Sequence, residues 1–291
     1  MRLCSPTRSC AALRSTWRPR WPFLVPGSCR RRDSMAIWQI FALSPGGRTV
    51  DWSTRLYLHP LGETTTSAYF LWVLQGEGGP VLVDTGFTHR LAELKGVPVE
   101  RLRPRQELLA AAGVDRESVR TVILTHLHWD HFDLEGAFPR ATCWVQRREV
   151  EFWAGYGATE PWYGRFLSDR FSDELQELQS AGRLQVIEGA LEVTPGVRVE
   201  WVGGHSPGMQ IVVVETARGP FVIANDALTT YRNLREWIPP AIHLGSIPEC
   251  FAAMRRIRAL CDGDESRLCP GHDSEVWQRF PEVAPGVYRL G

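Results

Sequence analysis

The sequence has little of what membrane-spanning or nucleic-acid-binding proteins require. No apolar run approaches the ~18 residues that a membrane-spanning helix needs. The formal net charge at pH 7 is zero, so the balance of charge gives no sign of a polyanionic partner. Lysine occurs once, as Lys95. We therefore expect no membrane segment and no nucleic-acid partner.

Closely spaced cysteine pairs are also absent. The chain has seven cysteines, none of them in a Cys-x-x-Cys spacing: Cys4, Cys10, Cys29, Cys143, Cys250, Cys261 and Cys269. An odd number of cysteines in a long chain without a secretory signal favours reduced, buried thiols and a cytoplasmic location. A cysteine-ligated zinc site is not expected.

The first 34 residues differ in composition from the rest of the chain. Residues 1–34 contain eight arginines and one acid, Asp33, whereas the remainder contains 25 basic and 32 acidic residues. This segment shows neither helical nor strand periodicity. For residues 1–34 we predict a disordered basic extension, or sequence upstream of a natural start at Met35; a targeting or nucleic-acid-binding arm is the alternative. Residues 35–291 then form one folded domain.

In the remainder, short apolar strands alternate with helical patterns. Strands are predicted at 36–43, 67–74, 81–83, 119–124, 142–145, 184–187, 197–202, 210–214, 221–224 and 266–269. Helical patterns cover 104–112, 147–153, 156–181 and 247–261. This order indicates a single domain with two sheets and helices outside them.

Three of the eight histidines fall within six residues. They are His126, His128 and His131, with Asp130 among them. The cluster follows a continuously apolar strand, at the carboxyl end where open sheets place their sites. Alternation along an extended segment points His126 and His128 the same way. Zinc-like cations take imidazole and carboxylate ligands, and burying four such groups without a cation would be costly. The pattern therefore predicts a metal site.

His-x-His-x-Asp-His after an apolar strand resembles the signature of the metallo-β-lactamase superfamily. The other motifs of that family follow in order: Val83-Asp84-Thr85-Gly86, Gly203-Gly-His-Ser-Pro-Gly208, Asp226 at the end of an apolar strand, and Pro270-Gly-His-Asp273. The resemblance runs from about Ser67 to the C-terminus. It implies an α+β fold, an αββα sandwich of two mixed β-sheets flanked by helices, for the hydrolase domain at 35–291.

The resemblance also implies a dinuclear site. The first metal would be bound by His126, His128 and His205, the second by Asp130, His131 and His272, with Asp226 bridging the two. Asp84 would support a metal-binding histidine from behind. We expect two divalent ions per chain, Zn²⁺ by preference, with Fe, Mn or Co as alternatives. A bridging hydroxide would be the nucleophile, and Asp130 or Asp226 would relay the proton.

Within the superfamily the sequence is most similar to the N-acyl homoserine lactonase group. The matching stretches include Thr125–His131, Val145-Gln-Arg-Arg-Glu149, Val193-Thr-Pro-Gly196 and Gly204-His-Ser-Pro-Gly-Met-Gln210. This implies opening of a lactone or cleavage of a related ester, and a protein that is a monomer or a homodimer.

The chain departs from the lactonase pattern in two places. The group's tyrosine, three residues after the bridging carboxylate, is Thr229 here, and Tyr231 is the candidate to replace it. Phe132-Asp-Leu-Glu follows the ligand cluster in place of a small, glycine-rich continuation. The aromatic segment 152–171 is either a pocket wall or a core-facing helix.

Several other activities are consistent with the same motifs. The ester could be replaced by a thioester, a carbamate or an amide. A phosphodiester is the weakest of these options, since phosphate recognition favours clusters of Arg or Lys and Lys95 is the only lysine. An iron-dependent oxidoreductase of the sulfur dioxygenase type would use only the first set of ligands. A purely structural metal site closes with four ligands, fewer than the seven found.

Overall fold

The computed structural model describes residues 37–100, 102–135 and 137–291. The residues from Met35 onward form one compact unit. The basic segment 1–34 and the disorder predicted for it lie outside the described residues, as do Cys4, Cys10 and Cys29.

The larger sheet has eight strands in the order β12-β13-β1-β2-β3-β4-β5-β6. The strands are β1 (Gln39–Asp51), β2 (Thr64–Gln75), β3 (Val81–Val83), β4 (Thr121–Ile123), β5 (Thr142–Gln146), β6 (Leu184–Ile187), β12 (Glu282–Ala284) and β13 (Val287–Arg289). Pairing from β12 to β3 is antiparallel, whereas pairing from β3 to β6 is parallel.

The smaller sheet has five strands in the order β11-β10-β9-β8-β7. They are β7 (Ala190–Thr194), β8 (Val197–Trp201), β9 (Gln210–Thr216), β10 (Gly219–Asn225) and β11 (Leu268–Pro270). Only the β10–β11 pair is parallel. Strands β8, β10 and β11 consequently run in the same direction.

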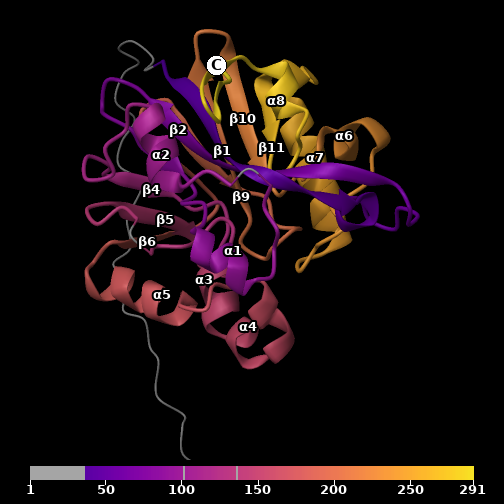
Figure 1. The fold of residues 1–291 in the computed structure, drawn as a ribbon, viewed down its shortest axis with the longest axis horizontal. Helices are drawn as coiled ribbons and strands as arrows, with labels where there is room; N and C mark the ends of the chain where they lie inside the picture. The colour runs from indigo at the N-terminus through magenta and orange to yellow at the C-terminus, as the bar shows by residue number, and fades with distance from the viewer. Residues whose placement is uncertain (1–36, 101, 136) are drawn as a thin grey trace, which may run out of the picture. The chain divides into compact units, whose positions relative to one another are not determined.

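Helices lie outside both sheets (Figure 1). Those in the first two thirds of the unit are η1 (Trp52–Thr54), α1 (His89–Leu94), α2 (Arg105–Ala111), α3 (Arg147–Ala154), α4 (Tyr156–Thr159), η2 (Pro161–Arg165) and α5 (Phe171–Ser180). Those in the last third are α6 (Tyr231–Glu236), α7 (Ile247–Leu260), η3 (Glu265–Arg267) and α8 (Val276–Arg279). Helix α2 contacts β1, α3 and α5 contact β6, and α7 contacts β10.

Strand β2 shows how the sequence produces this layering. Every residue from Ser67 to Leu74 is buried, because one face of the strand meets the second sheet and the other meets helices. Alternate residues point to opposite faces, and Ala68, Phe70 and Trp72 accordingly join the core between the sheets. Tyr69, from the other face, packs instead with Phe87 and α1. The predicted αββα sandwich is thereby confirmed.

The topology gathers several strand ends at one edge of the sandwich. The His126–His131 segment follows β4, and Asp84 follows β3, its parallel neighbour. In the second sheet, Asp226 and His272 follow the parallel strands β10 and β11. Polar residues that would be costly inside the apolar sandwich are thus placed where strands end, in loops that converge.

Sequence periodicity identified the long apolar strands but missed several short elements. Strand β7, with no buried residue, and the C-terminal pair β12 and β13 were not predicted. Helices α1, α6 and α8 have at most six residues, too few to show a helical stripe. The segment predicted as helical over 156–181 is divided into α4, η2 and α5, since Pro161 cannot continue the helix that precedes it.

The four described cysteines, Cys143, Cys250, Cys261 and Cys269, are free and buried, as predicted. Burial raises the pKa of the Cys143 and Cys269 thiols to about 12. These thiols are therefore protonated and unreactive near neutral pH. No helix in the described ranges is long and apolar enough to cross a membrane.

Trp72 joins the two sheets, and its loss should destabilise the sandwich. The side chain is fully buried, and its indole N–H donates to Cys269 Sγ of β11 at 3.4 Å. Trp72→Ala should lower the free energy of unfolding by about 3–5 kcal/mol, through lost apolar burial and the cavity left behind. Urea denaturation would measure this. Trp72→Phe should cost clearly less, and equal stability of the Ala variant and the parent would contradict this account of the core.

Candidate metal centre

Seven side chains meet at the edge where the strands end. They form two neighbouring groups, in each of which the potential ligand atoms lie within 4.8 Å of one another. The first group is His126, His128, His205 and Asp226, and the second is Asp130, His131 and His272. These are the seven residues that the sequence predicted as metal ligands, contributed by the loops after β4, β8, β10 and β11. Their role as ligands remains a prediction.

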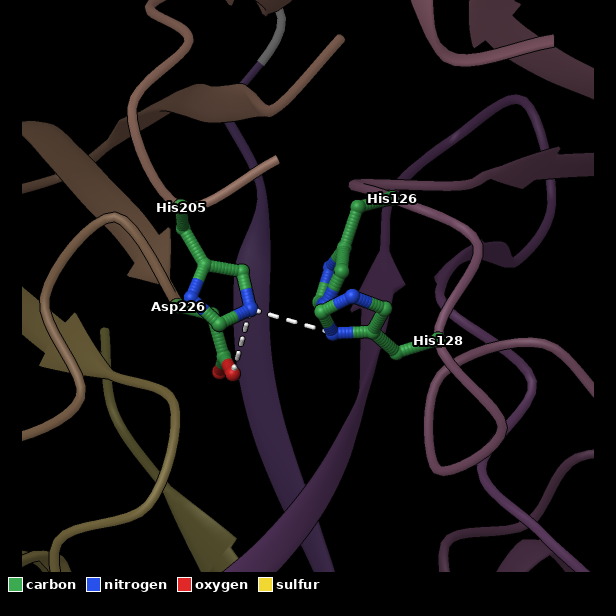
Figure 2. A group of neighbouring side chains, drawn as sticks. All are labelled: His126, His128, His205 and Asp226. Carbon is green, nitrogen blue, oxygen red and sulfur yellow. Dashed lines mark hydrogen bonds and ion pairs between the residues drawn. The ribbon is translucent and has the colours of Figure 1, made fainter. Parts of the chain in front are cut away.

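In the first group the imidazoles face one another across the gap between two loops. Figure 2 shows His126 and His128 reaching in from one side, and His205 and Asp226 from the other. His128 Nδ1 lies 3.0 Å from His126 Nε2 and 3.1 Å from His205 Nε2. His205 Nε2 also lies 3.3 Å from Asp226 Oδ2. The expectation that His126 and His128 point the same way agrees with this geometry.

Asp226 lies between the two groups. Its Oδ2 atom is 3.3 Å from His205 Nε2 and 3.2 Å from His272 Nε2, while Oδ1 is 3.6 Å from His131 Nε2. Asp130 closes the second group, with Oδ2 at 3.6 Å from His131 Nε2 and 3.5 Å from His272 Nε2. A single carboxylate thus contacts both groups, as a bridging ligand must.

Hydrogen bonds behind the imidazoles fix which nitrogen points inward. His205 Nδ1 bonds the Ile242 carbonyl at 3.0 Å, and His272 Nδ1 bonds the Ala68 carbonyl at 2.8 Å. Because a carbonyl only accepts, Nδ1 carries the proton in both rings and Nε2 presents its lone pair to the centre. The protein thereby selects the tautomers that can bind a cation.

Asp84 fixes the orientation of residues in the loop after β4 in a similar way. It is completely buried and accepts hydrogen bonds from Thr125 N at 2.7 Å, Thr125 Oγ1 at 2.9 Å and the Asn225 side-chain amide. Its Oδ2 lies 2.8 Å from His131 Nδ1. Asp84 therefore ties His131 to the residue before Asp226, in agreement with the supporting role that the sequence predicted for it.

The electrostatics keep the imidazoles of the first group neutral and Asp226 ionised. Burial, reinforced by neighbouring imidazoles, lowers the pKa of His126 and His128 well below the usual range. Burial by itself would raise the pKa of Asp226, but His272, His131 and His205 hold it well below its ordinary value. Neutral imidazoles and an ionised carboxylate are the forms that coordinate metal.

The donor set fits a pair of divalent cations. Buried polar groups normally have hydrogen-bond partners, yet His131 Nε2 and Asp226 Oδ1 are buried at the centre of the cluster without one. Inward lone pairs on several neutral imidazoles also repel one another unless a cation lies between them. Imidazole and carboxylate together suit zinc and similar metals.

Gly271 leaves room for Asp226. A Cβ atom at Gly271 would overlap Asp226 Oδ1, so a side chain there would displace the carboxylate shared by the two groups. This close approach explains the glycine of the Pro270-Gly-His-Asp273 motif in steric terms.

Glu149 is a buried carboxylate whose role the sequence did not reveal. From helix α3 it accepts hydrogen bonds from Leu127 N at 3.0 Å, Ser206 Oγ at 2.8 Å and Gly208 N at 2.8 Å. Burial raises its pKa, and these donors oppose the rise. Leu127 separates two of the clustered histidines, and Ser206 follows His205. Glu149 thus braces both loops of the first group, which no spacing in the sequence could show.

A cavity of about 430 Å³ opens onto the centre. His128, Asp130, His205, Asp226 and His272 form its floor. The remaining walls combine apolar and cationic side chains: Arg48, Arg55, Tyr69, Leu94, Lys95, Val97, Trp129, Arg165, Phe166 and Ile242. None of the three arginines was predicted to have a functional role, because they come from segments that carry no motif.

The structure does not bring Tyr231 to the centre. The side chain is fully buried, and its hydroxyl donates to the Leu268 carbonyl at 2.9 Å, so the catalytic contact predicted for it is not supported. Thr229 has a structural role as well, with its hydroxyl bonded to the Arg55 carbonyl at 3.0 Å. Among the described residues, the tyrosine that lines the cavity is Tyr69.

The aromatic segment 152–171 contributes one aromatic residue to the cavity lining. Phe166 lies on the wall and stacks on His128 with ring centroids 5.0 Å apart. Phe152, Tyr156 and Tyr163 pack mainly against one another. Phe132, noted as a departure from the lactonases, is completely buried and does not line the cavity. Phe166 thus fits the pocket-wall interpretation and the buried Trp153 and Phe171 fit the core-facing one, whereas Tyr156 is exposed.

Comparisons with known sequences agree with this geometry. The family model of the metallo-beta-lactamase superfamily matches residues 61–272. An N-acyl homoserine lactonase of Bacillus thuringiensis is 27% identical over 265 residues, covering 85% of this chain and 99% of the relative. The N-acyl homoserine lactonase AttM of Azorhizobium caulinodans is 28% identical over 194 residues, covering 61% of this chain and 66% of the relative.

Solved structures show the same fold. A quorum-quenching N-acyl homoserine lactone lactonase superposes with a TM-score of 0.68 at 23% identity, covering 86% of this chain and 98% of the other. AidC, a dizinc quorum-quenching lactonase solved with a product, superposes with a TM-score of 0.65 at 15% identity, covering 89% and 96%. Together with the family model, which spans most of the chain, these likenesses show that this protein belongs to the metallo-β-lactamase superfamily.

Proposed function

We propose that this protein is a dinuclear metal hydrolase that opens a lactone or cleaves a related ester, as the N-acyl homoserine lactonases similar to it in sequence do. The observation that carries the proposal is the pair of ligand groups that share Asp226. His126, His128 and His205 would hold one cation, Asp130, His131 and His272 the other, and Asp226 would bridge them.

Two divalent cations in such a site would supply an activated water and polarise a carbonyl oxygen. The chain's own residues hold the metal ligands in position and exclude water from the substrate. The Nδ1 hydrogen bonds of His205 and His272 keep their ligand nitrogens in place, so little reorganisation is needed during the reaction. Apolar wall residues such as Trp129, Phe166 and Ile242 exclude water from the reacting ester and accommodate its carbon chain.

Asp130 is better placed than Asp226 to move a proton. Its side chain is 12% exposed and lies on the cavity floor, whereas the Asp226 side chain is 5% exposed and is enclosed by three imidazoles. We propose that an Asp130 carboxylate oxygen takes the proton of the attacking water and returns it to the leaving alcohol oxygen.

The same site leaves the alternative substrates to experiment. Thioesters, carbamates and amides present the same carbonyl carbon to an attacking water, so a substrate panel must separate them. A mononuclear iron oxidoreductase would need only the first group, and the second group of Asp130, His131 and His272 gives it no support. For the location of the protein we propose the cytoplasm, supported by the four free, buried thiols.

Removing one ligand of the second group should lower both the number of bound metal ions and the catalytic activity. For His131→Ala we expect bound metal to fall below two ions per chain and kcat/KM on acyl lactones to fall by at least about 100-fold. Loss of a residue that only supports a ligand typically costs about 10–100-fold, and loss of the ligand itself should cost more. Elemental analysis and an acid-release assay would measure both. Asp130→Asn should retain more metal than activity. His89→Ala, an exposed histidine, is the matched control; a fully active, metal-replete His131→Ala would refute the proposal.

Glu149 should affect metal affinity without touching metal. Glu149→Ala leaves the Leu127 and Gly208 amides unpaired and releases both loops, so we expect zinc affinity to fall by about 10–100-fold. Competition with a chromogenic chelator would measure this. Glu149→Gln, which keeps the shape and one acceptor oxygen, should retain more affinity. The exposed Glu151 of the same helix provides the control Glu151→Ala; unchanged affinity in a folded Glu149→Ala protein would disprove the bracing role.

A further inference from the structure

Two arginines in the wall of the cavity lack an anionic partner. Arg55 is 7% exposed, and its Nε atom is buried without a hydrogen bond, as is Nε of Arg48. Both side chains line the cavity above the candidate metal centre. In the ranges that the structure describes, no carboxylate lies within ion-pair distance of either guanidinium, although ion pairs involve many of the chain's other arginines.

The fold holds these arginines in fixed positions. Arg48 of β1 is paired in register with Ser67 of β2, and an Arg55 Nη2 atom donates to the Ser67 hydroxyl. The Arg55 carbonyl accepts hydrogen bonds from Thr229 Oγ1 at 3.0 Å and from Ala241 N at 3.1 Å. Thr229 is the position at which the lactonases that this sequence resembles have their tyrosine, so the residue that replaces it supports Arg55.

Burying such a cation without an anion is unfavourable. Burial lowers the pKa of Arg55, and the carboxylates of Asp226 and Asp130 oppose this effect. Both carboxylates belong to the candidate metal centre, and bound cations would neutralise them. Because a buried charge without a counter-charge is strongly unfavourable, the site retains an unmet requirement for negative charge.

The other cations of the cavity differ from this pair. Lys95 Nζ already donates to the Gly164 carbonyl at 3.0 Å, and Arg165 Nε donates to the Trp162 carbonyl at 3.2 Å. Lys95 and Arg165 are thus engaged by backbone carbonyls. Arg48 and Arg55 line the same cavity with unbonded, buried Nε atoms and without a carboxylate partner among the described residues, so their guanidinium charges are available to an anionic ligand.

Tyr69 lies beside the pair and adds a neutral donor. It is 2% exposed, and its ring contacts His272 with centroids 5.4 Å apart. Its side chain lines the same cavity as Arg48 and Arg55. A phenol hydroxyl can donate a hydrogen bond to an anion held there.

We propose that Arg48 and Arg55, together with Tyr69, form an anion-binding subsite, and that the lactone or ester hydrolysed here carries a carboxylate or a phosphate. Guanidinium groups bind both anions through paired N–H donors. An N-acyl homoserine lactone is neutral and offers no such group. The inference rests on the proposed hydrolase function and narrows its substrate class to anionic esters.

Kinetics on two matched lactones would test the subsite. The probes are a γ-butyrolactone bearing a carboxylate on the ring and the same lactone with that carboxylate converted to a methyl amide. The wild-type holoenzyme should prefer the carboxylate. Arg55→Met should lower kcat/KM for the carboxylate by about 10–100-fold, the value of a charge-assisted hydrogen bond, and for the amide by less than about threefold. Because kcat/KM excludes product release, the carboxylate formed by ring opening does not affect this comparison.

Matched variants separate a specific subsite from general positive potential. Arg165→Met removes a rim cation of the same cavity and should change the carboxylate preference by less than about threefold. Arg55→Lys should restore part of the preference, because it returns the charge without the paired donors. If Arg55→Met fails to fold, as judged by circular dichroism, Arg48→Met carries the same expectation. Equal losses on both lactones, or no preference in the wild type, would overturn the subsite.

Binding measurements distinguish failure of this inference from failure of the proposed function. Calorimetric titration of the holoenzyme with succinate, and separately with inorganic phosphate, should give binding at least about tenfold weaker in Arg55→Met; the tighter of the two anions identifies the group. If neither lactone is hydrolysed but this difference persists, the proposed function fails and the subsite stands. If the lactones are hydrolysed and Arg55→Met binds both anions as the wild type does, the subsite fails alone.

Discussion

The structure depends on one electrostatic constraint, the convergence of five imidazoles and two carboxylates at a buried edge of two sheets. Lone pairs and negative charge brought this close repel one another and are deprived of water, so the arrangement is unfavourable without cations. The rigid apolar sandwich nevertheless holds these side chains together. Its strands end in the same direction at the same edge, and each loop that follows has little freedom to move its ligand away.

Support for the centre comes from carboxylates that do not belong to it. Asp84 joins the β4 loop to Asn225 and so to Asp226, while Glu149 joins the β4 loop to the loop of His205. Each is buried and accepts several hydrogen bonds, which fixes position and orientation together. The two sheets are thereby connected by polar contacts at the point where the chemistry needs the least movement.

The cavity adds a second electrostatic feature of opposite sign. Arg48 and Arg55 lie in a wall that combines apolar and cationic side chains, beside a floor that would hold metal cations. Such a cavity should favour a substrate with an ester near one end and negative charge near the other. The single lysine of the sequence made phosphate an unfavourable ligand, whereas the folded chain brings together arginines that lie far from the motifs.

The sequence by itself predicted the candidate ligands and, through the family resemblance, the fold. The pattern of His126 to His131 is local in the chain, whereas His205, Asp226 and His272 were identified only through the family resemblance. Only the tertiary structure decided that Tyr231 turns into the core, that Glu149 braces two loops, and that Arg55 faces the cavity. These roles depend on contacts between residues distant in sequence, and spacing along the chain carries no information about which side chains meet across two sheets.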